Sequence, residues 1–380
     1  MKKLGLPVSR IGTFAAVAAL LVIGAQAQSV ITNNDIYRAP NSATWMKLSG
    51  SELKPAATLK TKGWGLGGGF FGTAAQAVVQ VGSNVCVFIA DPGSDDIAAF
   101  NGTRYVGNYI DPAGSGAYDG IALAVHGDQL YAGYSASVNI GVWSIKPGCS
   151  LVLANSAANT PSWAPIDDLA VSPDGKTLVV TYGEPDIDSF AILGTKLKEK
   201  GPFPSAGNTT GIDITSDSKY AIVADFSTNQ TQVEVFPLNP NSSLGGTDDY
   251  VVPQGGSNSN NVWLSPDETL LFVSNSNSAQ ITTLRFDEKA GKQRRLTFDC
   301  LTSLNVAGGS FYALGMATEE TNGRGGFLYV AEAGTNGGPS GIALLQIPQD
   351  GCPAEVSGSP FSNSAGAWPV TLTAYPPRPF

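Results

Sequence analysis

A pattern of short β-strands recurs along the middle of this chain. It occurs over residues 169–193, 212–238 and 262–286, and each copy begins with an apolar strand followed by a polar turn. A strongly apolar strand, a small polar loop and an alternating polar and apolar strand then follow. A repeated unit of this kind buries its apolar faces by packing against its neighbours. The chain is therefore predicted to be a repeat protein built of β-hairpins.

The turn between the first two strands of a copy has residues with a clear conformational role. Pro173 and Pro266 preset φ at the first central position of a tight turn. Asp174 and Asp267 can hydrogen-bond to nearby main-chain groups, and Gly175 tolerates a positive φ. Because apolar strands flank the turn on both sides, it predicts a β-hairpin. We interpret these aspartates as turn residues and not as catalysts.

The end of the second strand is the most regular marker of the repeat. It recurs seven times along the chain, at intervals of 43 to 58 residues. Units of about this length with four short strands each predict an all-β fold, a seven-bladed β-propeller, and no amphipathic helix of useful length interrupts them. The seven marker residues are Asn33, Asp91, Tyr134, Tyr182, Asp225, Asn275 and Glu332.

The two ends of the chain are predicted to complete one blade together. The first copy, residues 30–61, begins at a second strand and lacks an innermost one. The segment Trp368–Tyr375 alternates like a single strand without a partner nearby in the sequence. Each blade of a propeller packs on two neighbours, so the ring must close. We predict that this segment pairs with Val30–Asn33 as the innermost strand of the last blade.

The N-terminal residues 1–27 are typical of a signal peptide. Three basic residues precede a short apolar run, and Ala25-Gln26-Ala27 forms a small-x-small cleavage sequence. A membrane anchor is the alternative, but the apolar run is short for crossing a bilayer. We predict a secreted or periplasmic protein whose propeller covers residues 28–380, with no membrane span after cleavage.

Charge and cysteine content narrow the range of partners. Cleavage removes three positive charges and takes the formal net charge from −9 to −12, which argues against a nucleic-acid partner. The sequence has no CxxC and a single histidine, so a zinc site of the usual kind is not expected. Several cysteines are interpreted as small buried apolar residues, and no disulfide is predicted because outer positions of different blades diverge. The four cysteines are Cys86, Cys149, Cys300 and Cys352.

The repeats resemble a known family. The sequences "SPDG…LVVTY…IDSFAI" and "SPDE…LFVSN…ITTLRF", with the glycine-rich "TKGWGLGGGFF" of residues 61–71, are similar to seven-bladed lactonase-type propellers, which include 6-phosphogluconolactonase-like and YVTN-repeat proteins. The resemblance covers nearly all of residues 28–380 and is specific for architecture, since one fold hosts many functions. It implies arginine or histidine in the cleft of members that act on anionic substrates. Here the one histidine, His126, aligns with Ser172 in a turn on the opposite face, and we interpret it as a turn residue.

The mouth of the central channel is the predicted binding region. The starts of the innermost strands and the loops after the second strands are expected to line it. These segments bring acidic and amide side chains toward one rim, with few cations among them. The candidate ligand-binding residues are Asp119, Asp167, Asp168, Asp213, Asn261, Asp225, Glu332 and Tyr182, with Asn260, Asp91, Asn275 and Tyr134 beside them.

Three interpretations of this rim stay open. Two of its carboxyl groups could act as general acid and base on a lactone or a similar neutral sugar derivative. The oxygen-rich ring could hold a structural Ca²⁺, the one cofactor considered. The Asp and Asn side chains could instead cap turns and satisfy main-chain groups.

The predicted function is that of an exported, monomeric lactonase-like propeller. Its channel mouth is expected to bind a small neutral or cationic ligand, with lactone hydrolysis as the candidate reaction. The alternative is a non-catalytic extracellular scaffold for a protein or a glycan. The scarcity of cations at the rim favours a neutral ligand or a scaffold over a phosphorylated substrate.

Overall fold

The structure is a computed structural model in which most of the chain after residue 27 is described. The described residues are 28–67, 76–114, 120–159, 165–226, 231–246, 248–252, 256–292, 294–305, 311–318, 325–334, 340–363, 369 and 371–376. The predicted signal peptide, Asp119 and Trp368 lie outside these ranges.

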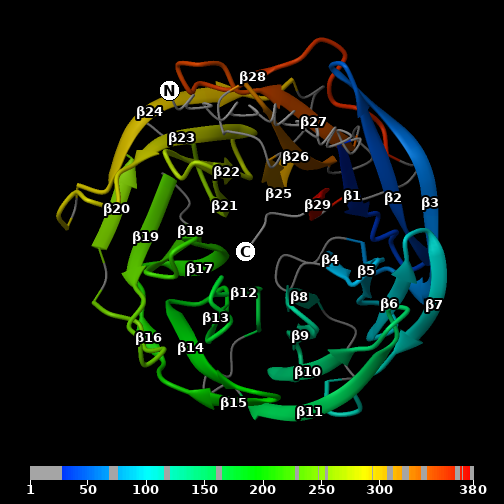
Figure 1. Ribbon diagram of the computed structural model, residues 1–380. Coiled ribbons are helices and arrows are strands. Elements are labelled where there is room, and N and C mark those ends of the chain that lie inside the picture. The colour runs from blue at the N-terminus through cyan, green and yellow to red at the C-terminus, as the bar shows by residue number, and fades with distance from the viewer. Residues whose placement is uncertain are drawn as a thin grey trace, which may run out of the picture.

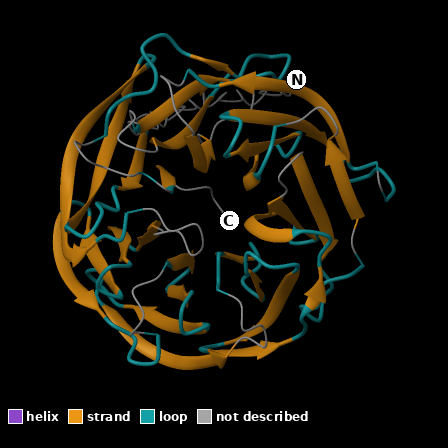
Figure 2. Ribbon diagram, turned by 180° about the vertical axis from the view of Figure 1, so that it is seen from behind, coloured by secondary structure: helices purple, strands orange, loops and turns teal. Residues whose placement is uncertain are grey.

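Seven antiparallel sheets form a ring, which confirms the predicted seven-bladed propeller (Figure 1). Figure 2 shows the same ring from behind, and the described part of the chain contains no helix. Blade 1 contains β29 (Leu372–Tyr375), β1 (Ser29–Asn33), β2 (Pro40–Ser49) and β3 (Glu52–Trp64). Blade 2 contains β4 (Gln76–Val81), β5 (Asn84–Asp91), β6 (Asp96–Asn101) and β7 (Arg104–Tyr109).

The next three blades follow in chain order around the ring. Blade 3 contains β8 (Ile121–His126), β9 (Gln129–Tyr134), β10 (Asn139–Ile145) and β11 (Leu151–Asn159). Blade 4 contains β12 (Asp168–Val171), β13 (Thr177–Thr181), β14 (Asp186–Leu193), β15 (Lys196–Glu199) and the short β16 (Phe203–Pro204). Blade 5 contains β17 (Asn208–Ile214), β18 (Tyr220–Phe226), β19 (Thr231–Pro237) and β20 (Asp248–Val252).

The last two blades bring the chain back to blade 1. Blade 6 contains β21 (Ser259–Leu264), β22 (Leu270–Asn275), β23 (Gln280–Phe286) and β24 (Leu296–Ser303). Blade 7 contains β25 (Phe311–Thr318), β26 (Phe327–Gly334), β27 (Gly341–Gln346) and β28 (Ala354–Glu355). The first strand named in each blade is innermost, so one of its edges has no neighbour within its own sheet.

Blade 1 is closed by the two ends of the chain, as predicted. Strand β29 runs antiparallel to β1, with Ser29 opposite Tyr375 and Thr32 opposite Leu372. Thr32 also donates a hydrogen bond from Oγ1 to the carbonyl oxygen of Thr371, at 3.2 Å. The predicted partners are therefore correct over the part of the segment that the structure describes.

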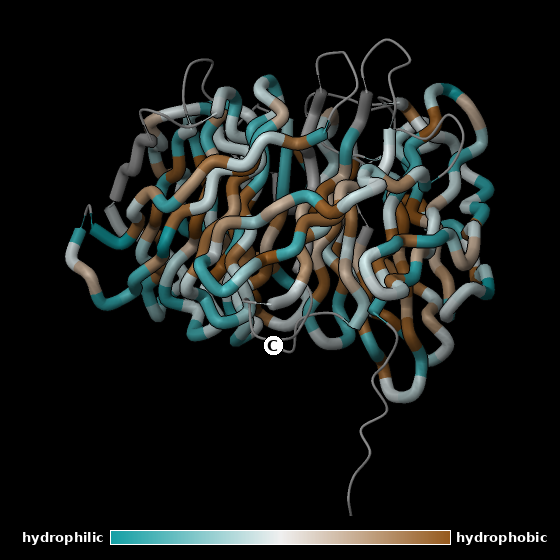
Figure 3. The backbone as a smooth tube through the Cα atoms, turned by 90° about the horizontal axis from the view of Figure 1, so that it is seen from above, coloured by the Kyte–Doolittle hydropathy of each residue, from teal (hydrophilic) through white to brown (hydrophobic). Residues whose placement is uncertain are grey.

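The core lies between the blades and not within any one of them. Adjacent residues of second strands are buried on both faces of their sheet, as with Phe88 and Ile89, both fully buried. Phe88 packs with blade 3 and Ile89 with blade 1. In Figure 3 the hydrophobic segments run along the strands through the body of the ring, and hydrophilic segments gather toward its two edges. Each blade therefore depends on both neighbours for burial of its apolar faces.

The turns between first and second strands adopt the predicted chemistry. Ser172 donates its Oγ–H to Asp174 Oδ1 at 2.7 Å, and the main-chain N–H of Lys176 donates to the same oxygen at 3.1 Å. Gly175 has a φ of +69°, as a turn of this kind requires. His126 ends β8 beside such a turn, and its Nε2 lies 3.0 Å from the carbonyl oxygen of Pro173 in the next blade. These contacts assign structural roles to both Asp174 and His126.

Two disulfides join neighbouring blades, although none was predicted from the sequence. Cys86 of β5 pairs with Cys149, which lies between β10 and β11, with Cα atoms 5.2 Å apart. Cys300 of β24 pairs with Cys352, which lies between β27 and β28, with Cα atoms 6.0 Å apart. In both pairs the hairpin between third and fourth strands reaches over the preceding blade. Equivalent positions do diverge around the ring, but these four cysteines are not at equivalent positions.

Candidate functional site

The channel mouth lies where the innermost strands begin. Asp168 at the start of β12 is opposite Thr181, and Ser259 at the start of β21 is opposite Asn275. The starts of innermost strands and the ends of second strands therefore share one edge of the ring, as the sequence predicts. Among the described residues that begin innermost strands there is no lysine, arginine or histidine.

Two candidate carboxyl groups hold neighbouring innermost strands together. Asp168 accepts the main-chain N–H of Leu169 at 2.8 Å through Oδ1 and that of Ile212 at 3.1 Å through Oδ2. Ile212 belongs to β17 of the next blade. These N–H groups lie on strands that have no further partner toward the channel. The carboxyl group thus satisfies donors on two open strand edges.

Asp213 repeats this arrangement one blade further along. Its Oδ1 accepts the N–H of Ile214 at 2.9 Å, and its Oδ2 accepts the N–H of Leu264 of β21 at 2.7 Å. Both carboxyl groups therefore bridge two innermost strands, in agreement with the interpretation that such side chains satisfy main-chain groups.

The electrostatics of Asp168 differ from those of an ordinary surface carboxyl group. Burial raises the pKa of Asp168 to about 7, and the nearby charge of Asp213 adds to the rise. The two N–H donors, from Leu169 and Ile212, act in the opposite direction because they favour the ionised form. A carboxyl group with a pKa near neutrality can both accept and release a proton at physiological pH.

The other predicted residues at the starts of innermost strands take part in contacts between strands. Asp167 is 6% exposed, and its N–H donates to the carbonyl oxygen of Thr181 at 2.9 Å. The main-chain N–H of Asn261 donates to Ser274 Oγ at 3.0 Å. Its side chain packs on Gly211, where an added Cβ would lie 2.8 Å from Asn261 Nδ2.

The residues that end the second strands lie between blades. The side chain of Asp225 is fully buried and accepts hydrogen bonds from Ser205 Oγ and Gln232 Nε2, each at 3.2 Å. Tyr182 is also fully buried, and its hydroxyl donates to Asp188 Oδ2 at 2.6 Å. A role for these two residues in ligand binding stays a prediction.

The same position in blade 2 is a buried carboxyl pair. Asp91 is fully buried and accepts a hydrogen bond from Asn41 Nδ2 at 2.8 Å. Burial and the charge of Asp96 raise the pKa of Asp91 well above its usual range. Gly63 packs so closely on this carboxyl group that an added Cβ would lie 2.3 Å from Asp91 Oδ2.

Glu332 takes the corresponding position in blade 7. Its side chain is 1% exposed, yet among the described residues neither of its carboxyl oxygens has a hydrogen-bond partner. Burial raises the pKa of Glu332 to about 8, and the charge of Glu355 contributes to the rise. A buried carboxyl group without a partner carries a large cost when ionised.

Several buried polar residues of these interfaces were not predicted from the sequence. They include Asn41, Asp96 and Asp188, and burial raises the pKa of Asp188 to about 7. One signal was available for Asp188, because it interrupts the apolar run of its strand in "DIDSFAIL". Its hydrogen bond to Tyr182 depends on how two strands pair, which the sequence pattern does not show.

The described residues were compared with the side-chain groups that hold metal ions and with the helices that cross membranes. No group of three or more His, Cys, Asp or Glu side chains there is arranged to hold a metal ion. No helix among the same residues has the length and apolarity needed to cross a membrane.

Comparisons with known proteins find similarity in structure but not in sequence. No protein-family model and no curated protein sequence matches the chain. A Bacteroides fragilis protein described as a candidate 6-phosphogluconolactonase aligns over 92% of this chain and 98% of its own, with a TM-score of 0.66 and 17% identity. The periplasmic gluconolactonase of Pseudomonas aeruginosa aligns over 92% and 99%, with a TM-score of 0.61 and 16% identity.

A third similar structure has a different described role. A Sulfolobus tokodaii protein that is described as a hypothetical selenium-binding protein aligns over 92% of this chain and 94% of its own, with a TM-score of 0.67 and 7% identity. The chain thus has the fold of the lactonase-type seven-bladed propellers, as its repeats predict. Because proteins of different described function share this fold, the fold does not select one activity.

Proposed function

We propose that the protein is an extracytoplasmic lactonase-like propeller that binds a small neutral or cationic ligand at its channel mouth and hydrolyses a lactone there. One observation carries this proposal. Asp168 has a pKa raised to about 7 and lies close enough to Asp213, on the neighbouring innermost strand, for the charge of one to act on the other. A carboxyl group with a pKa near neutrality can act as a general acid or base, and a second carboxyl group nearby is a common companion in such sites.

The chemistry requires one proton to be taken up and one to be released. Ionised Asp168 would accept a proton from water as the oxygen attacks the lactone carbonyl carbon. The ring C–O bond then breaks, and the proton returns to the departing alkoxide oxygen. The lack of cations among the described residues that begin innermost strands supports a neutral or cationic ligand over an anionic one.

Extracytoplasmic location is supported by two features. The chain forms two disulfides, and disulfide bonds persist in oxidising compartments. One similar structure is described as periplasmic, although that description belongs to the other protein. The signal-peptide pattern of residues 1–27 predicts the same location.

Hydrolysis of a panel of sugar and aromatic lactones tests the proposal. We expect turnover by the parent protein and a loss of at least about 100-fold in D168N, from the usual size of acid–base effects. D128N is the matched control, since Asp128 is exposed in a turn on the opposite face. No turnover by the parent, or equal turnover in D168N and D128N, contradicts catalysis by Asp168.

A non-catalytic scaffold for a protein or a glycan is the second candidate. The observation in its favour is that all four carboxyl oxygens of Asp168 and Asp213 already accept main-chain N–H groups. A structural role of this kind needs no substrate. Absence of lactone hydrolysis, together with lower melting temperatures in D168N and in D213N, favours the scaffold.

A further inference from the structure

The β27–β28 hairpin of blade 7 has a very short pairing at its outer edge. Strand β28 has two residues, whereas the last strands of the other sheets, β3, β7, β11, β15, β20 and β24, have four to thirteen. Two residue pairs join β28 to β27, Leu345 with Glu355 and Gln346 with Ala354. The few main-chain hydrogen bonds of so short a ladder contribute little stability. The tip of this hairpin therefore depends on contacts with the neighbouring blade.

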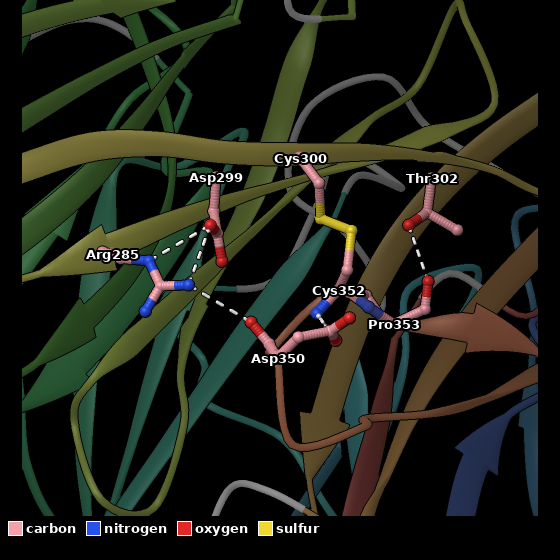
Figure 4. Close-up of a disulfide and its surroundings, with 7 residues drawn as sticks. All are labelled: Arg285, Asp299, Cys300, Thr302, Asp350, Cys352 and Pro353. Carbon is pink, nitrogen blue, oxygen red and sulfur yellow. Dashed lines mark hydrogen bonds and ion pairs between the residues drawn. A yellow bond between two sulfur atoms is a disulfide. The ribbon is translucent and has the colours of Figure 1, made fainter.

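The two outer strands of blade 6 supply these contacts. Figure 4 shows Thr302 of β24, which donates from Oγ1 to the carbonyl oxygen of Pro353 at 2.7 Å. On the other side of the view, Arg285 of β23 donates to the carbonyl oxygen of Asp350 at 3.2 Å. Between these two hydrogen bonds lies the Cys300–Cys352 disulfide, which ties the tip to β24 covalently. Once that bond is open, non-covalent contacts alone hold the tip to blade 6.

The chain continues from this hairpin toward the strand that closes the ring. After β28 it stays beside β27, where the N–H of Val356 donates to the carbonyl oxygen of Leu344 at 2.9 Å. Ile342 and Phe361 then exchange two main-chain hydrogen bonds, each at 2.9 Å. The next strand along the chain is β29, the innermost strand of blade 1. A bond that anchors the hairpin to blade 6 therefore also anchors the segment that leads to β29.

The two disulfides of the chain differ in burial. Cys86 and Cys149 are both fully buried, in a core cluster between blades 2 and 3 that includes Leu130. Cys300 and Cys352 are both partly exposed. Exchange between a thiol and a disulfide requires a thiolate to reach a sulfur atom. Access to the first bond requires separation of two blades, whereas local opening of a short hairpin is sufficient for the second.

We propose that the Cys300–Cys352 disulfide is a redox-sensitive clasp, which a dithiol reductant opens in the folded protein so that the β27–β28 hairpin is released from blade 6. A thiolate of the reductant attacks one sulfur atom, and the S–S bond breaks as a mixed disulfide forms. The second thiolate of the reductant then displaces the remaining cysteine and closes a disulfide within the reductant. The chain gains two electrons and two protons as two thiols, while the Cys86–Cys149 bond stays closed. The clasp is separate from the proposed lactone site on β12 and β17 and does not depend on it.

Reduction of the folded, oxidised protein by dithiothreitol tests the clasp. Free thiols are blocked with iodoacetamide at set times, and mass spectrometry of the peptides measures the labelling of each cysteine. We expect Cys300 and Cys352 to be labelled at least about tenfold faster than Cys86 and Cys149, because local opening costs less free energy than separation of two blades. Circular dichroism should stay that of the oxidised protein over the same period.

Three results would overturn the proposal. The two pairs of cysteines could be labelled at equal rates, or Cys86 and Cys149 could be labelled first. Labelling of Cys300 and Cys352 could also appear only as the circular dichroism of the fold is lost. In each case the bond between blades 6 and 7 is not opened selectively in the folded protein.

Hydrogen exchange shows whether the open bond releases the hairpin. In the selectively reduced protein the main-chain amides of residues 354–361 should lose protection, while those of β5 should keep it and serve as the internal control. C300S/C352S should show the same loss without reductant, and its remaining disulfide should open at the slow rate of the parent. If this variant does not fold, exchange in the reduced parent still decides. Unchanged protection of residues 354–361 after reduction contradicts release of the hairpin.

Discussion

Removal of the last strand tests the closure of the ring. A chain that ends at Thr371 lacks β29, which supplies the innermost strand of blade 1. Two side chains of that strand, Leu372 and Ala374, are 5% and 8% exposed and pack in the interface with blade 7. Their removal leaves β1 with an open edge and uncovers part of the core. We therefore expect the whole propeller to lose stability, although the deleted residues lie at the end of the chain.

The size of the effect follows from burial and pairing. Leu372 and Ala374 contribute about 2 and about 1 kcal/mol by burial. Four residue pairs join β29 to β1, and their main-chain hydrogen bonds contribute roughly 1 kcal/mol each. The free energy of unfolding should thus fall by about 7 kcal/mol, which is comparable to the whole stability of many proteins.

Urea denaturation followed by circular dichroism measures this loss. The control is a chain that ends at Pro376, which retains all of β29. We expect the control to unfold at the midpoint of the parent and the shorter chain to unfold at much lower urea, or to be unfolded without it. If the shorter chain has the midpoint of the parent, closure by β29 does not stabilise the ring, and the reasoning is refuted.

Three further predictions concern the interfaces between blades. G63A should lower the free energy of unfolding by about 2 kcal/mol, because the added methyl group overlaps the buried Asp91 carboxyl group. C300S/C352S should lower it by about 4 kcal/mol, the loop-closure value for a sequence separation of 52. Stability should fall as pH rises from 5 to 8, because burial raises the pKa of Asp168 from 3.8 to about 7 and the folded state favours its neutral form. D168N should show a smaller fall, by an amount on the order of 3 kcal/mol.

Each of these predictions has its own control, and all use urea midpoints. G246A is the control for G63A, since a Cβ added at Gly246 meets no atom within 4 Å. Equal midpoints for G63A and G246A would contradict the close packing on Asp91. For the cysteine variant, the parent measured with a mild reductant shows whether loss of the bond reproduces the substitution. For the pH prediction, D128N should keep the pH dependence of the parent, and an identical slope in D168N would rule out Asp168 as its source.

The propeller could be predicted because its signals are local. The Ser172–Thr177 turn contains the residues that define its conformation, and the alternation of apolar residues marks the strands on both sides of it. The regular spacing of these units implied seven blades, and the incomplete first copy implied closure by the C-terminal segment. Each step used residues close together in the sequence, or the requirement that a ring of blades must close.

The disulfides could not be predicted in this way. Cys86 and Cys149 occupy different positions in their blades, and they meet because one hairpin reaches over the blade before it. The separation of their Cα atoms depends on the angle between two sheets. Sequence spacing carries no information about that angle.

The candidate site, too, was predicted from the sequence only in part. The sequence by itself determined which polar residues end the strands, and it placed Asp168 and Glu332 at one edge of the ring. Only the tertiary structure decided that Asp168 bridges two innermost strands, whereas Glu332 is buried with no hydrogen-bond donor from the part of the chain that the structure describes. The physical reason is that a side chain's environment is set by the facing blade, and the residues of that blade come from a distant part of the chain.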